Sequence, residues 1–346
     1  MRLLKPLLLL LLFLSLFIVY IFFSTGFFKT VENKFEGDIL KRVPIVGAED
    51  IMISTEDKFA LISSTDRAHL IPESERQNGL YLIDLTDDSY TPIYLSGSFN
   101  KPFNPHGISF YKKDSFYQVM AINHTDNGHF IEMFELNDKT LTHIKTLRDD
   151  AMIQPNDLVM VDENRFYFTN DHGYTEGIGK FVEDYIGIGF SNVVYFDGQN
   201  YSVVSDRIAY ANGINVDKKR NLVYVASVRK FLVKVYILED DGSLSFVEDI
   251  PCGTGVDNIE LDTEGNLWIG SHPNLMVLST HLKTGEGISP SEIIKINYRA
   301  KGDYTISQIY TEEGEEMSGS TVAAVYEDLI FMGNVVEKDF LILKQN

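Results

Sequence analysis

A short phrase that recurs along the chain constrains its fold more than any other feature. The stretch from Asp257 to Asn274 starts with two polar residues and continues as an alternating strand, a polar turn that contains Gly265, and a second strand. Alternating strands joined by a glycine-containing turn are typical of a β-hairpin. The same order appears five more times, so we expect a fold built from repeated antiparallel units.

The spacing of the six copies predicts the architecture. They start at residues 49, 106, 156, 212, 257 and 320. Repeats of about 40–50 residues with several strands each are typical of propeller blades. Further strand-like runs lie between the copies, at 79–85, 129–136, 192–196, 232–238 and 244–249. We therefore predict an all-β fold, a six-bladed β-propeller over residues 45–346, with residues 340–343 supplying the last strand.

One stretch departs from the strand pattern. Residues 178–190 have apolar side chains at helical spacing and lie between the third and fourth hairpins, which predicts an inserted capping helix. Two interpretations stay open, a helix that caps the propeller or an apolar lid over its mouth that faces a membrane.

The N-terminus is strongly apolar. Residues 7–23 carry no charge, and about 20 apolar residues suffice for a helix to span a bilayer. Arg2 and Lys5 precede this run, which keeps the N-terminus cytoplasmic and the rest of the chain extracellular, luminal or periplasmic. We expect a hydrophobic transmembrane signal-anchor helix over residues 1–28 and a linker or polar helix over 29–44. A signal peptide that is cleaved to give a secreted protein is the alternative.

Charge and cysteine content limit the partners and the chemistry. The chain has 30 Lys and Arg against 50 Asp and Glu, a formal net charge of -20 that argues against nucleic acid as a partner. This excess of acid suits a solvated surface and equally a hard cation such as calcium. The single cysteine, Cys252, excludes an intramolecular disulfide, and we interpret it as a small buried residue.

The residues that start the hairpins are mostly acids and amides. Equivalent positions of inner strands converge on the axis of a propeller. Converging carboxylates cost several kcal/mol unless a cation compensates them. Calcium takes about 6–8 oxygen ligands of these types, so the set favours calcium over zinc. The alternative is that Asp and Asn merely favour turns before strands, which would suffice for one copy. The starts are Glu49, Asp50, His106, Asn156, Asp157, Asn212, Asp257, Asn258 and Ser320.

Four histidines lie at corresponding positions. His106 starts a hairpin, and the second strands end at His124, His172 and His272. An imidazole on a shared rim can serve as a general base. We expect the other four to be surface or structural residues; they are His69, His129, His143 and His281.

Eight stretches of the chain resemble the paraoxonase (arylesterase) family, in the family's order and across about residues 45–343. They are 103–109, 123–124, 156–159, 166–172, 211–215, 256–259, 267–274 and 319–323. The resemblance implies a six-bladed propeller with two calcium ions (Ca2+) in its central tunnel and an uncleaved hydrophobic N-terminus.

By position, the resemblance also implies the roles of individual residues. The catalytic calcium would be held by Glu49, Asn156, Asn212, Asp257 and Asn258. The structural calcium would be held by Asp50, Asp157 and the backbone carbonyl of Ile108. The catalytic histidine dyad would be His106 and His124, with Asp171, His172 and His272 near the mouth or just behind the ligands.

The chain also departs from the family pattern. Neither end carries the cysteine that closes the propeller in mammalian members, so strand pairing must close the ring. Ser271 stands where the family has a free cysteine, and residues 67–78, which would line the mouth, match poorly. The resemblance therefore does not extend to the segment that would set the substrate range.

The implied function is calcium-dependent hydrolysis of lactones and aryl esters. Calcium would polarise the carbonyl and stabilise the oxyanion, and His106 would take a proton from the attacking water with help from His124. The expected partners are a small lactone or ester and, through the N-terminal helix, a membrane. Two alternatives are a sugar-lactone hydrolase of the gluconolactonase type and a non-catalytic, membrane-anchored binding propeller.

Overall fold

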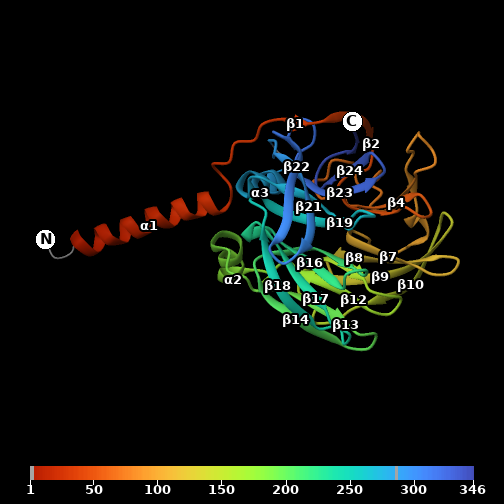
Figure 1. Ribbon diagram of the computed structural model, residues 1–346, viewed down its shortest axis with the longest axis horizontal. Coiled ribbons are helices and arrows are strands. Elements are labelled where there is room, and N and C mark those ends of the chain that lie inside the picture. Colours follow the sequence, from red (N-terminus) through yellow and green to blue (C-terminus); the bar gives the residue numbers. More distant parts are fainter. Residues whose placement is uncertain (1–3, 285–286) are drawn as a thin grey trace.

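Each of the six repeated hairpins forms the two inner strands of one antiparallel sheet, as the sequence pattern predicts (Figure 1). The computed structural model describes residues 4–284 and 287–346. The hairpins are β3 (Ala48–Ser54) with β4 (Phe59–Ser64), β7 (Pro105–Lys112) with β8 (Tyr117–Thr125), β11 (Pro155–Met160) with β12 (Phe166–Asn170), β15 (Ala211–Asp217) with β16 (Leu222–Ser227), β19 (Gly255–Leu261) with β20 (Leu267–His272), and β23 (Ser320–Tyr326) with β24 (Leu329–Asn334).

Two further strands complete each blade. In chain order they are β5 (Gly79–Asp84) and β6 (Ile93–Tyr94), β9 (Gly128–Asn137) and β10 (Thr140–Leu147), β13 (Ser191–Phe196) and β14 (Tyr201–Ile208), β17 (Leu232–Leu238) and β18 (Leu244–Pro251), β21 (Ser291–Ala300) and β22 (Asp303–Glu312), and β25 (Phe340–Gln345) with β2 (Gly37–Val43). The short strand β1 (Lys34–Phe35) extends the fifth blade beyond β22.

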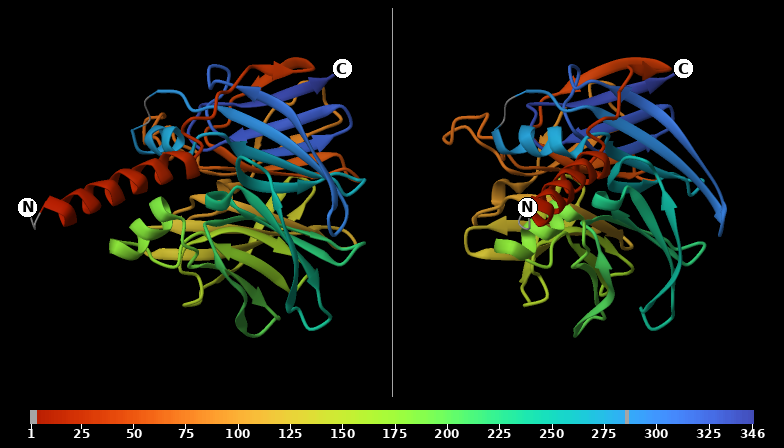
Figure 2. Two further views of the ribbon diagram at one scale, coloured as in Figure 1. Left: turned by 60° about the vertical axis from the view of Figure 1, so that its left-hand side comes forward. Right: turned by 90° about the vertical axis from the view of Figure 1, so that its left-hand side faces the viewer.

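The six first strands form a closed ring. Each contacts the next in the order β3, β7, β11, β15, β19 and β23, and β23 contacts β3 again. Six apolar clusters fill the spaces between neighbouring sheets; in one of them Ile51 of the first blade packs with Phe331 of the last. The sheets therefore fan out around one centre (Figure 2). The contacts between the first strands bring the hairpin starts toward this centre.

The two ends of the chain close the ring by strand pairing. β2 pairs antiparallel with β25, with Val43 opposite Phe340 and Gly37 opposite Gln345. This confirms closure without a disulfide. It also corrects the linker or polar helix expected over residues 29–44, because residues 37–43 pair with β25 and supply the outer strand of the last blade.

Helical segments gather at one end of the propeller. The apolar helix α1 (Leu4–Ser24) projects from it, and the insertion forms α2 (Gly177–Phe181), continued by a π-helical turn at Val182–Ile186. This confirms the inserted helix, which ends four residues earlier than its apolar spacing predicts. A third helix, α3 (Leu275–Thr284), was not predicted; its first turn is capped by Asn274 Oδ1, which accepts from the Val277 N–H at 3.2 Å. Short 3₁₀ turns lie at Ser96–Ser98 and Val228–Lys230.

Candidate functional site

Each predicted ligand of the catalytic calcium lies where the register of its hairpin breaks. Pairing skips from Pro155 to Leu158, from Ala211 to Ile214 and from Val256 to Ile259. Similar breaks follow Ala48 and Pro105. A bulge at the start of a strand turns side chains away from the regular alternation. These breaks therefore aim the hairpin starts into the centre of the ring.

Glycines allow the inner strands to come close enough for this convergence. A Cβ at Gly107 would lie 2.5 Å from the Asp157 Cα, and one at Gly213 would lie 2.4 Å from the Asp257 carbonyl oxygen. Real Cβ atoms do not approach so closely, so only glycine fits at either position.

Five buried oxygen atoms at the centre have no hydrogen-bond partner among the residues that the structure describes. They are Glu49 Oε2, Asn156 Oδ1, Asn212 Oδ1, Asp257 Oδ1 and Asn258 Oδ1, one from each predicted ligand of the catalytic calcium. An unpaired buried acceptor costs about 1–3 kcal/mol. Five such acceptors at one place fit a cation that prefers oxygen ligands.

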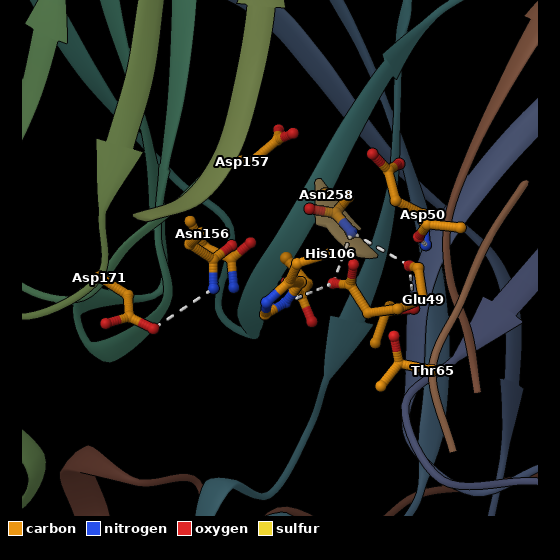
Figure 3. A network of polar contacts seen from close by, with 12 residues as sticks. Glu49, Asp50, Thr65, His106, Asn156, Asp157, Asp171 and Asn258 are labelled. Atoms are coloured by element: carbon orange, nitrogen blue, oxygen red, sulfur yellow. Dashed lines mark hydrogen bonds and ion pairs between the residues drawn. The ribbon is translucent and has the colours of Figure 1, made fainter. Parts of the chain in front are cut away.

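Four of these five side chains are held by neighbours through their other polar atoms (Figure 3). Asn258 Nδ2 donates to Glu49 Oε1 at 3.0 Å, and Asn156 Nδ2 donates to Asp171 Oδ2 at 3.4 Å. Asp257 Oδ2 pairs with His272 Nε2 at 2.6 Å. These contacts orient each side chain so that one oxygen remains for a cation.

The sixth hairpin start does not join the set. Ser320 Oγ donates to backbone carbonyls, including that of Glu292 at 3.0 Å. The next residue, Thr321, donates from Oγ1 to the Glu49 carbonyl at 2.6 Å. The sixth blade therefore holds the backbone of Glu49, a predicted ligand, but supplies no predicted ligand itself.

A second group of carboxylates follows one residue further along two of the strands. Asp50 Oδ2 accepts from the Ile108 N–H at 2.8 Å, and Asp157 Oδ2 accepts from the Ile214 N–H at 2.7 Å. Burial raises the pKa of both carboxyls well above the usual value, Glu49 raises that of Asp50 further, and Asp50 raises that of Asp157. Glu260, which the hairpin pattern did not single out, has its pKa raised by burial and by Asp50. A cation among these acids would relieve their repulsion.

The two predicted catalytic histidines touch, and a third extends them. His106 Nε2 lies 3.2 Å from Glu49 Oε1, and His106 Nδ1 lies 3.0 Å from His124 Nε2. His124 Nδ1 lies 2.7 Å from His129 Nδ1. Burial, and then the neighbouring imidazoles, hold the pKa of His124 well below the usual value. His129 is the second residue of β9 and lies outside the hairpin pattern, so the expectation of a merely surface or structural role missed this contact.

Two residues predicted near the mouth, Asp171 and His172, form a second series of polar contacts. His172 Nδ1 pairs with Asp171 Oδ1 at 2.6 Å, and His172 Nε2 pairs with Asp184 Oδ1 of the inserted helix at 2.8 Å. Burial opposes the charge of His172, but the two carboxylates raise its pKa to about 9. Asp171 also accepts a hydrogen bond from Asn156, so this series of contacts links the insertion to a predicted ligand.

Arg229 joins the same insertion to the N-terminal helix. Its guanidinium donates to the carbonyls of Asp184 and Tyr185 at 2.8 and 2.7 Å, and to the Ser24 carbonyl at 2.7 Å. Tyr20 Oη also donates to the Ile186 carbonyl at 2.7 Å. The base of α1 is therefore built into the end of the propeller that carries the insertion.

Other features of the surface do not compete with this centre. A large surface hollow lies among the hairpin turns at the other end of the inner strands and contains Lys113, Glu163 and Arg165, but no predicted site residue. Within the described ranges, no three His, Cys, Asp or Glu side chains group as metal ligands, and three of the five central ligands are amides. Cys252 is partly buried, and burial raises the pKa of its thiol to about 12, so it is no nucleophile.

Comparison with known proteins gives a consistent result. The model of the arylesterase family matches residues 29–342. The chain is 33% identical to serum paraoxonase/arylesterase 1 of Homo sapiens over 267 residues, 75% of each chain. It is 32% identical to serum paraoxonase/arylesterase 1 of Rattus norvegicus over 308 residues, 84% of each chain.

Solved structures share the fold at low identity. A luciferin-regenerating enzyme superimposes with a TM-score of 0.58 at 13% identity, covering 91% of this chain and 96% of the other. A putative gluconolactonase superimposes with a TM-score of 0.56 at 11% identity, covering 93% of this chain and 96% of the other. Regucalcin from Agrobacterium tumefaciens, described as a calcium-binding protein, superimposes with a TM-score of 0.52 at 15% identity. The match covers 90% of this chain and 96% of the other. At these identities the likeness establishes the propeller alone.

Proposed function

The chain belongs to the arylesterase family and is a hydrolase of esters and lactones, and we propose that its activity depends on calcium bound at the centre of the propeller. The observation that carries this proposal is the convergence of five buried oxygens that lack partners in the described part of the chain. Two come from carboxylates and three from neutral amides, so a divalent ion would be balanced in charge and held by oxygen alone.

The ligands proposed for this ion are Glu49, Asn156, Asn212, Asp257 and Asn258. When bound, calcium polarises the substrate carbonyl and stabilises the negative charge that develops on its oxygen. Two contacts keep the ligands in place for this task, that of Asn258 to Glu49 and that of His272 to Asp257. A second, structural calcium is proposed between Asp50 and Asp157, with the carbonyl of Ile108 as a further ligand.

The histidine chain can handle a proton in either direction. With Glu49 accepting, His106 donates from Nε2 and accepts at Nδ1 from His124, which accepts in turn from His129. Reversing all three tautomers makes His106 Nε2 an acceptor that faces the ligand site. In that arrangement His106 serves as the general base toward water, and His124 and His129 carry the displaced proton away.

We further propose that the N-terminal helix anchors the protein in a membrane and that the propeller lies outside the cytoplasm. Residues 5–24 form an apolar helix with no buried residues in its spanning window. The insertion beside its base exposes apolar side chains, among them Ile178 and Phe181, which favours the lid interpretation. Thr25 is only 4% exposed and its carbonyl accepts from the Leu275 N–H, so a cleavage site there would be buried. Mass spectrometry of the mature protein should find the residues before 25 retained; a start near residue 27 contradicts the anchor.

A panel of lactones and aryl esters, assayed with and without calcium, tests the proposed function. The expected result is hydrolysis that is lost on chelation and restored by calcium. Unchanged hydrolysis after chelation contradicts the metal site. Preference for gluconolactone over acyl lactones would favour the sugar-lactone alternative, and bound calcium without any hydrolysis would favour the binding propeller.

A further inference from the structure

Arg67 places a positive charge beside the proposed calcium site. It lies in the segment between β4 and β5, where residues 67–78 match the family pattern poorly. Nη1 of its guanidinium is buried and has no partner among the residues described, while Nη2 donates to the Pro105 carbonyl at 3.4 Å, next to His106. A buried donor without a partner costs free energy unless a ligand satisfies it.

The charges that Arg67 faces belong to the site. Burial lowers the pKa of the guanidinium, and Glu49 and Asp257 act against this lowering. Burial likewise opposes the charge of Glu49, but His106 and then Arg67 lower the pKa of this carboxyl. Arg67 thus interacts electrostatically with both proposed carboxylate ligands, although no hydrogen bond joins it to either within the described residues.

The segment that carries Arg67 is held in one shape. Asp66, which is 4% exposed, accepts from the N–H groups of Leu70 and Ile71 at 2.8 and 2.9 Å and pairs with Arg76 at 3.0 Å. Thr65 donates from Oγ1 to the Pro105 carbonyl at 2.8 Å and lies beside Glu49 in Figure 3. Arg67 is therefore presented by an ordered arm and not by a freely moving loop.

The charge balance indicates what Arg67 binds. Glu49 and Asp257 together carry two negative charges, which one divalent cation balances at the catalytic site, so neither carboxylate is needed as a counter-ion for Arg67, whose Nη1 still lacks a partner among the described residues. The chain as a whole carries -20, so an anion is repelled elsewhere. A guanidinium pairs with a carboxylate through two parallel hydrogen bonds.

We infer that Arg67 binds a carboxylate of the substrate, so that the preferred substrates are lactones or esters that carry a second, ionised acid group. This inference rests on the proposed hydrolytic function and adds the substrate class to it. The calcium acts on the reacting carbonyl, and Arg67 holds the distant carboxylate, which makes it a specificity-determining residue.

Kinetics with a matched substrate pair test this role. The pair is a γ-lactone with a carboxylate substituent and the same lactone with a neutral primary amide in its place. We expect Arg67→Gln to lower kcat/KM for the carboxylate by about 10- to 100-fold, mainly through KM, as for one charge-assisted hydrogen bond. The amide should change less than about twofold, and Arg67→Lys should recover part of the loss. Lys113→Gln, at the far hairpin turn, controls for net charge and should affect neither substrate.

A binding measurement separates this role from catalysis. The corresponding lactam carboxylate is not hydrolysed, and calorimetry should show weaker binding to calcium-loaded Arg67→Gln than to wild type. Equal loss on both substrates, or no loss on either, overturns the inference. If wild type hydrolyses neither lactone, the proposed function fails, while the lactam still reports on Arg67 independently.

Discussion

Asn258 donates from Nδ2 to both the carbonyl and Oε1 of Glu49, at 3.1 and 3.0 Å, across 209 residues of sequence. Neither Asn258 Oδ1 nor Glu49 Oε2 takes part in this contact, so both oxygens stay available to a cation.

The first prediction follows from this pair. Asn258→Leu removes one ligand oxygen and the donor that orients Glu49, so we expect calcium to bind at least about 10-fold more weakly. Because a ligand that binds more weakly stabilises the folded state less, the rise of Tm with calcium should also shrink. Calorimetric titration and thermal unfolding measure both effects. Asn200→Ala, at an exposed turn, is the control; an equal loss there, or none in Asn258→Leu, rules out this ligand assignment.

His129 tests the proton route. His129→Phe removes the hydrogen-bond partner of His124 Nδ1, so His129 can no longer take up the proton that His106 passes through His124. We expect kcat to fall about 10-fold with little change in KM, as for the loss of one proton-transfer partner. His143→Phe is the control, because His143 pairs with Glu132 and does not contact the three linked histidines. Steady-state kinetics on one lactone decide; equal values for wild type and His129→Phe end the role of His129.

The inner-strand glycines should not tolerate a methyl group. Gly107→Ala forces a Cβ against the Asp157 Cα, and overpacking of this kind usually costs about 1–3 kcal/mol or more. Gly97→Ala meets only ordinary contacts, 3.8 Å from Tyr94, and should be close to neutral. Denaturant unfolding compares them, and equal stability of the two variants would contradict the close approach of β7 and β11.

Much of the fold and part of the candidate site could be predicted from the sequence. The hairpin period predicts six blades, and the polar starts predict which residues meet, because both depend on local pattern. His129, Glu260 and Arg67 were not assigned to the site, since only the assembled ring brings a residue of a third strand, a residue further along an inner strand and a loop residue to the centre. The strand at 37–43 was missed because its partner lies at the other end of the chain.

His172 predicts a pH-dependent contribution to stability. Its pKa in the folded protein is raised to about 9, whereas an exposed histidine has a pKa of about 6.5. The contribution is therefore full below about pH 6.5 and is lost as the pH rises through about 9. The difference in unfolding free energy between wild type and His172→Gln should fall over that range by about 3 kcal/mol at most. Asp184→Asn removes one of the two carboxylates, so it should lower the pKa of His172 and end the pH-dependent loss below pH 9. Parallel curves for wild type and His172→Gln would show that folding does not raise the pKa of His172.

The most direct test of the account compares a metal ligand with the proposed base during calcium titration. We expect lactone hydrolysis by wild type to follow calcium occupancy, Asp257→Ala to lose calcium binding and activity together, and His106→Gln to keep calcium binding and lose less activity. If Asp257→Ala binds calcium and hydrolyses the lactone as wild type does, calcium at the centre of the propeller is not the catalyst.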